Sequence, residues 1–150
     1  MIFAIDPGTE QSGYCVLAGR GIYKSGVLPN AEMLRLVQDP DVTSTLGDIL
    51  AIEMVASYGM PVGREVFETV RWIGRFQQAW SEPEAVRLVY RQAVKLHLCK
   101  SVRAKDANIW QALKDRFGPE KLKVLGVKSH ARSALAVAVT VYDQLKGELQ

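Results

Sequence analysis

Residues 2–17 read IFAIDPGTEQSGYCVL, and this stretch decides the fold. Its apolar run at 2–5 is typical of a buried β-strand. The Asp-Pro-Gly sequence at 6–8 has the residue types of a tight turn, which ends that strand. A second apolar run follows at 13–17. The stretch therefore predicts two strands joined by a short connection, which is the start of an antiparallel sheet.

Three further strands are predicted outward from this pair. A Gly-Arg-Gly turn at 19–21 leads into a third strand at 22–28. A helix over 30–38 then separates the third strand from the apolar run 49–52, which predicts a fourth. A strand reached through a helix usually lies parallel to the first. The segment 86–90 predicts a fifth strand.

Apolar residues at helical spacing predict helices over 64–80, 104–117 and 129–146. The stretch 91–99 is ambiguous between helix and strand. Helices and strands in this order predict one α/β domain over residues 1–150, with a mixed five-stranded sheet flanked by helices.

Charge is distributed unevenly along the chain. Residues 1–85 hold six Lys or Arg against eleven Asp or Glu, whereas residues 86–132 hold twelve against three. A basic block that follows an acidic half suggests a polyanionic partner such as nucleic acid. A solvated basic surface without any partner fits this charge pattern equally well.

Membrane, secreted and zinc-binding classes are disfavoured by the sequence. No apolar run approaches the roughly 20 residues that a membrane span needs, and the first residues lack the basic start and long apolar stretch of a signal peptide. We therefore expect a cytoplasmic protein with no membrane partner. Cys15 and Cys99 are the only cysteines, and they are expected to pack as small apolar residues.

Asp6 and Glu53 each follow a predicted buried strand. If these strands are neighbours, the two carboxylates meet at one edge of the sheet. Carboxylates on rigid strands are the ligands that Mg²⁺ prefers, and two such ions about 4 Å apart can activate water in phosphodiester cleavage. Each residue also has a plain structural alternative, as a turn residue at Asp6 and as an exposed strand end at Glu53.

His130 begins the last predicted helix, directly after Ser129, which is expected to be its N-cap. Ser133 follows three residues later, so it shares a helix face with His130. An imidazole at this position could ligate a metal ion or act as a general base. A polar residue in a first helical turn is the alternative interpretation.

Taken in order, these segments resemble the RuvC family of Holliday junction resolvases. The resemblance is carried by the segments IFAIDPGTEQSGYCV, AIEMV and HARSALAVAVT. Two further segments look like the phage and prophage branch of that family, namely ASYGMPVGREVFETVRWIGRF and VKLHLCKSVRAKDANI. The resemblance covers nearly the whole chain, and it implies an RNase H-like fold and a nuclease domain.

The resemblance also implies a catalytic metal site. Asp6, Glu53 and His130 match catalytic, metal-binding positions, and two Mg²⁺ or Mn²⁺ ions per subunit are implied. The last helix of the family normally carries two acidic positions three apart, which are His130 and Ser133 here. Serine is a departure, because it removes a carboxylate from beside the site. We do not expect the helix of Asp106 to reach the site and compensate, so a weaker, Mn²⁺-preferring site or low activity is expected.

Basic residues of the same region are expected to face DNA. Lys95 and Lys105 match catalytic basic residues that lie close to the scissile strand in the family, where a lysine can stabilise developing charge. Arg91, Lys100 and Arg103 fit a broader phosphate-binding face. For each lysine, a solvated surface position remains the alternative.

Aromatic residues near the glycine-rich loop are candidates for base stacking. Phe67 corresponds to a region that borders the dimer interface in the family, and Tyr58 is a second candidate. The alternative for Phe67 is a place in the core. The helix over 64–80 is apolar on more than one side, which predicts packing on the sheet and on a second subunit.

The first hypothesis is therefore a homodimeric, structure-selective DNA endonuclease that nicks paired strands of four-way junctions and other branched DNA. The setting would be the cytoplasm of a bacterial cell, with the gene carried by a phage or prophage. A junction-binding protein with weak or no nuclease activity is the second hypothesis, which Ser133 favours. An RNase H-like nuclease acting on RNA or an RNA–DNA hybrid is the third.

Overall fold

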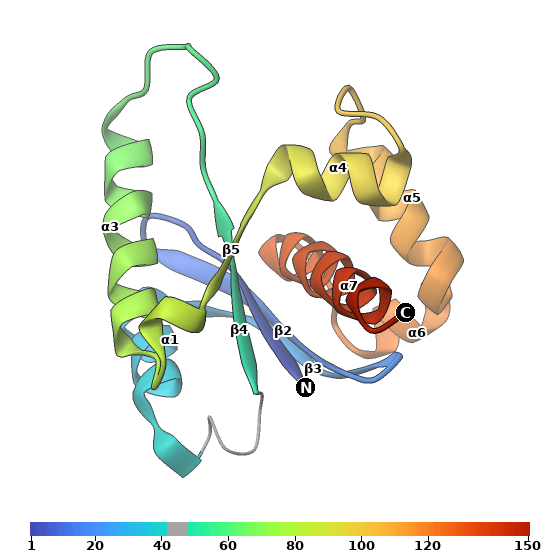
Figure 1. The fold of residues 1–150 in the computed structure, drawn as a ribbon, viewed down its shortest axis with the longest axis horizontal. Helices are drawn as coiled ribbons and strands as arrows, with labels where there is room; N and C mark the ends of the chain where they lie inside the picture. Colours follow the sequence, from blue (N-terminus) through green and yellow to red (C-terminus); the bar gives the residue numbers. More distant parts are fainter. Residues whose placement is uncertain (42–47) are drawn as a thin grey trace.

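A mixed five-stranded sheet in the order β3-β2-β1-β4-β5 forms the centre of the structure, a computed structural model that describes residues 1–41 and 48–150 (Figure 1). β1 pairs antiparallel with β2 and parallel with β4, as the sequence predicted, while β2–β3 is antiparallel and β4–β5 parallel. The strands are β1 (Ile2–Asp6), β2 (Gln11–Ala18), β3 (Gly21–Pro29), β4 (Ile49–Met54) and β5 (Arg87–Tyr90).

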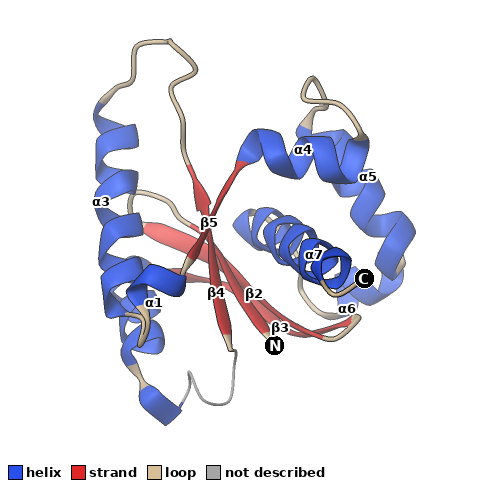
Figure 2. Cartoon of the chain, viewed as in Figure 1, coloured by secondary structure: helices blue, strands red, loops and turns tan. Residues whose placement is uncertain are grey.

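Helices cover both faces of the sheet (Figure 2). One layer holds α1 (Asn30–Gln38) and α3 (Arg64–Ala79), with the short 3₁₀ helix Pro83–Ala85 after them. The other layer holds α4 (Arg91–Cys99), α5 (Asp106–Phe117), α6 (Pro119–Val124) and α7 (His130–Glu148). The stretch 91–99, which the sequence left ambiguous between helix and strand, is the helix α4. The sequence analysis missed α6, which Pro119 starts because proline is well suited to a first helical position.

The alternation of side chains along the strands divides the core in two. Ile2 and Ala4 of β1 pack in the cluster that contains α7, whereas Phe3 and Ile5 pack against α1 and α3. β4 follows the same rule. Ala51 packs on the α7 side, whereas Leu50 and Ile52 pack on the side of α1 and α3. Successive side chains of a strand point to opposite faces. Asp6 and Glu53 therefore both point toward α7.

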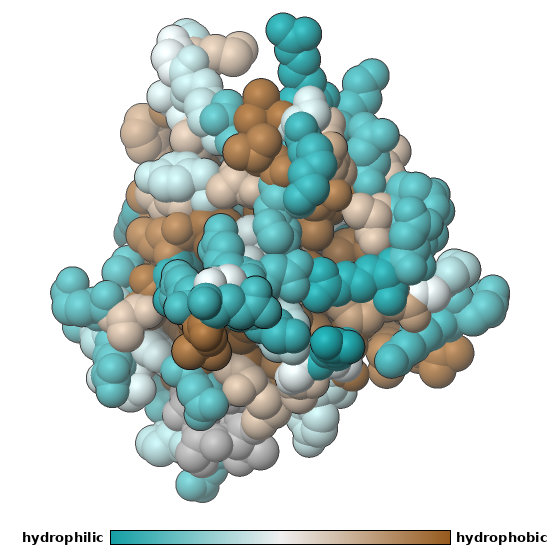
Figure 3. All heavy atoms as spheres, turned by 45° about the vertical axis from the view of Figure 1, so that its right-hand side comes forward, coloured by the Kyte–Doolittle hydropathy of each residue, from teal (hydrophilic) through white to brown (hydrophobic). Residues whose placement is uncertain are grey.

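The basic block of the sequence, residues 86–132, comprises β5, α4, α5, α6 and the approach to α7. Its charge is consequently concentrated in one helical layer. Figure 3 shows a largely hydrophilic surface on this side of the molecule, interrupted by smaller hydrophobic areas. Within the described residues, no helix has the length and apolar character needed to cross a membrane.

Candidate active site

Asp6 and Glu53 lie side by side at the carboxyl ends of β1 and β4. The register pairs Ile5 with Ile52, so the next residue on each strand carries a carboxylate. Both side chains are largely buried, with 15% and 12% of their surface exposed. The sheet therefore brings together the two strand-end acids that the sequence singled out, on its α7 face.

His130 joins this pair from the first turn of α7. Its Nδ1 lies 2.7 Å from Oδ2 of Asp6, so the imidazole and the carboxylate share a hydrogen bond. Ser129 is the N-cap residue, as expected, but it has a φ of 52° and its side chain makes no capping hydrogen bond to the helix. The helix start is instead held by close packing on β2, where Gly13 touches the backbone of His130.

A buried network that the sequence analysis missed fixes the turn after Asp6. Ser12 donates to Oδ1 of Asn30 at 2.6 Å, and Asn30 donates to the carbonyl of Gly8 at 2.9 Å. The backbone N–H of Gly8 donates to Ser12 Oγ at 3.3 Å. Ser12 and Asn30 are both buried, so their hydrogen bonds are made in a site shielded from water. The signal in the sequence was the Ser and Asn residue types, which favour turns.

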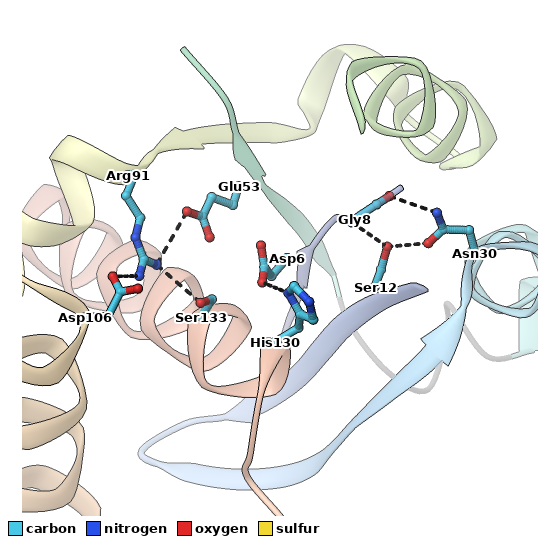
Figure 4. A network of polar contacts seen from close by, with 9 residues as sticks. All are labelled: Asp6, Gly8, Ser12, Asn30, Glu53, Arg91, Asp106, His130 and Ser133. Atoms are coloured by element: carbon cyan, nitrogen blue, oxygen red, sulfur yellow. Dashed lines mark hydrogen bonds and ion pairs between the residues drawn. The ribbon is translucent and has the colours of Figure 1, made fainter. Parts of the chain in front are cut away.

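Arg91 lies inside the carboxylate cluster (Figure 4). Its guanidinium is 3.5 Å from Oε1 of Glu53, donates to Ser133 Oγ at 3.4 Å, and pairs with Asp106. The expectation that the helix of Asp106 stays away from the site is wrong, because α5 begins beside Arg91. The sequence had assigned Arg91 only to a broad phosphate-binding face.

Burial makes the two acids hard to ionise together. It raises the pKa of Glu53 to about 8, with the neighbouring charge of Asp6 raising it further and Arg91 opposing the rise. Burial also raises the pKa of Asp6, and the hydrogen bond and charge of His130 oppose that rise. A second positive charge placed between the carboxylates would allow both to be ionised at neutral pH.

The residues present fit a divalent cation between the two acids. Oε2 of Glu53 is buried and has no hydrogen-bond partner among the described residues. Figure 4 shows this oxygen on the side of Asp6, whose own second oxygen is also free of the His130 contact. Carboxylate oxygens are the ligands that Mg²⁺ and Mn²⁺ favour. Within residues 1–41 and 48–150, no group of three or more His, Cys, Asp or Glu side chains is arranged to hold a metal ion. The fit of a cation therefore depends on the two carboxylates of Asp6 and Glu53.

The remaining basic candidates belong to α4, to the α4–α5 connection and to the residue before α5. Lys95 lies four residues after Arg91 on α4, hence on the same helix face, and Lys105 directly precedes α5. Neither lysine forms an ion pair within the part of the chain that the structure describes. Lys100 ends α4 and Arg103 lies in the exposed α4–α5 connection.

The aromatic candidates lie on the surface. Phe67 is 61% exposed in the first turns of α3, so a place in the core is excluded for it. Tyr58 is 55% exposed in the β4–α3 loop. An open hollow of about 740 Å³ separates α3 from the turn after β1, and His130 contributes to its lining. The hollow thus reaches His130, while neither Asp6 nor Glu53 is among its lining residues.

Replacing Glu53 by Gln should stabilise the metal-free protein at pH 8 by about 4 kcal/mol. The folded state keeps the proton of Glu53 up to about pH 8, whereas the unfolded chain releases it near pH 4.5. The stability of the parent should therefore fall as pH rises through this window, and the variant should lack this slope. Urea unfolding in the presence of a chelator, from pH 5 to 9, measures the free energy of unfolding of both proteins.

Glu84→Gln, in the exposed 3₁₀ turn, is the matched control, and its pH profile should follow that of the parent. Parallel profiles for the parent and Glu53→Gln would contradict the assignment.

The sheet order, its mixed pairing and the two helical layers define an RNase H-like α/β fold. Comparison with solved structures shows a RuvC-like form of it. The Thermus thermophilus RuvC structure matches with a TM-score of 0.71 and 19% identity, over 97% of this chain and 96% of that one. T. thermophilus RuvC in complex with Holliday junction substrate matches with a TM-score of 0.71 and 20% identity, over 97% and 95%. No protein-family model and no curated protein sequence matches the chain.

Proposed function

We propose that this protein is a divalent-metal-dependent endonuclease that nicks branched DNA, with four-way junctions as its substrate class. The observation that carries the proposal is the buried pair Asp6 and Glu53, with one oxygen of Glu53 left unpartnered beside Asp6. The similarity to RuvC, one structure of which is in complex with a Holliday junction substrate, supports the choice of DNA.

In this proposal Asp6 and Glu53 hold the cation, and His130 completes the site. A bound divalent cation would supply an activated water and neutralise charge that develops on the phosphate. His130 holds Asp6 through Nδ1, which leaves its other ring nitrogen free to accept a proton from the attacking water. Lys95 and Lys105 bind the phosphate of the scissile strand as point charges.

The surrounding surfaces suit a branched substrate. The basic layer of α4, α5 and α6 binds the phosphate backbone, with Lys100 and Arg103 at its edge. The exposed Phe67 and Tyr58 stack on bases at the opened centre of the junction. Phe67 and Val70 also form an exposed apolar stripe on α3, because residues three apart share a helix face. We propose that this stripe contributes to a homodimer, whose two-fold symmetry matches two symmetry-related strands.

Ser133 supports a second candidate function, which is junction binding with weak or no cleavage. Its hydroxyl accepts a hydrogen bond from Arg91, where a carboxylate would otherwise bind a metal ion. A neutral oxygen holds a hard cation less tightly than a carboxylate does.

The test uses the purified protein with a synthetic four-way junction and a linear duplex of the same sequence, in Mg²⁺, Mn²⁺ or chelator. We expect metal-dependent, paired nicks in the junction that leave 5′-phosphate ends, and no product from the duplex. Tight junction binding without product in either metal would establish the binding protein instead. Preferential cutting of an RNA–DNA hybrid offered in competition would favour the RNase H-like alternative.

A further inference from the structure

Arg91 is held in a fixed position next to Glu53 by the strand pairing. β5 runs parallel to β4, with Glu53 paired to Val89 and Met54 to Tyr90. Arg91 is the next residue and begins α4, so strand and helix together set its backbone. Its side chain is only 24% exposed. The guanidinium is therefore part of the cluster.

One oxygen of each acid contacts a residue outside the pair, and the other oxygen faces the partner acid. Oδ2 of Asp6 contacts His130, and Oε1 of Glu53 contacts Arg91. Figure 4 shows the order Arg91, Glu53, Asp6, His130 across the site, with the remaining oxygens in the middle. The two inner oxygens thus face each other at the point where one shared cation would replace a shared proton.

On the far side of Glu53 from Asp6, the guanidinium of Arg91, not an open space, lies next to Oε1 of Glu53. Arg91 there contacts Glu53 and Ser133 together, and Asp106 balances it from α5. Ser133 offers no charge to hold a metal ion against this guanidinium. Two cations a few ångströms apart repel strongly where burial reduces solvent screening.

We propose that the site binds a single divalent cation, between Asp6 and Oε2 of Glu53, and that the guanidinium of Arg91 takes the place of a second ion. This inference rests on the proposed metal-dependent function. It replaces the two ions implied by the family resemblance with one ion and one built-in positive charge. Asp106 and Ser133 act as positioning residues for Arg91.

The test measures Mn²⁺ binding to the whole chain without DNA, by calorimetry and by electron paramagnetic resonance of free Mn²⁺. The parent should bind one ion. Arg91→Gln removes a positive charge near that ion and should bind Mn²⁺ about tenfold more tightly. Arg91→Lys keeps the charge and should bind like the parent. Arg20→Gln, in the exposed β2–β3 turn, is the matched control and should also bind like the parent. Arg91→Gln combined with Ser133→Asp should bind two ions.

Two ions on the parent, or unchanged or weaker binding by Arg91→Gln, would overturn this inference while leaving metal-dependent cleavage intact. No ion on the parent would overturn the proposed function as well. The parent stoichiometry needs no substitution, so the inference is tested even where a variant fails to fold. Thermal unfolding of each variant without metal identifies such a case.

Discussion

Asp6→Asn is expected to lower metal-dependent cleavage of a four-way junction by at least about a hundredfold. Asparagine keeps the shape of the side chain but offers a neutral oxygen in place of the charge that holds the cation. It also removes the anionic partner of His130, which contacts Oδ2 at 2.7 Å. Time courses of nicked product in Mg²⁺ measure the loss, and gel-shift titration in chelator should show junction binding unchanged.

The fold should tolerate this substitution, because burial already raises the pKa of Asp6 and so disfavours its charge. The matched control is Asp48→Asn, just before the opposite end of β4, where the side chain is 89% exposed. It should cut like the parent. Parent-like cutting by Asp6→Asn would show that the reaction does not use this site, whatever the substrate.

The sheet was predictable because its central strands are short apolar runs that are buried on both faces. Phe3 and Ile5 face one layer while Ile2 and Ala4 face the other, so β1 is apolar at every position before Asp6 and stands out in the sequence. The segment after β5 was ambiguous because Val94 is the only residue of α4 that is fully buried. A helix with so narrow a buried stripe gives a weak periodic signal.

The candidate site was predictable where it lies on strand ends and unpredictable where it depends on packing between helices. Asp6 and Glu53 follow apolar runs, so their meeting at one sheet edge could be inferred from parallel pairing. The contacts of Arg91 with Ser133 and Asp106 join three helices, and no local pattern encodes such contacts. The approach of α5 to the site is set by this packing, which explains why Asp106 was misplaced.

Gly13→Ala is expected to destabilise the protein by about 3 kcal/mol or more. A methyl group at Gly13 would lie 2.2 Å from the carbonyl carbon of His130 and 2.5 Å from its oxygen. Both atoms belong to backbone, so no side-chain rotation relieves the overlap. The start of α7 would have to move away from β2. Urea unfolding of parent and variant at one pH measures the change in free energy.

The same substitution connects the packing of α7 to the proposed chemistry. Gly13 pairs with Asp6 across β1 and β2, so the residue that α7 touches lies directly beside the carboxylate. Moving α7 outward would lengthen the contact between His130 and Asp6, and cleavage should fall even under conditions where the variant is folded. Gly74→Ala on α3 meets nothing within 4 Å, so it should instead stabilise by about 0.5–1 kcal/mol, because alanine favours helix. A Gly13→Ala protein within about 0.5 kcal/mol of the parent would mean that the close contact between α7 and β2 does not exist.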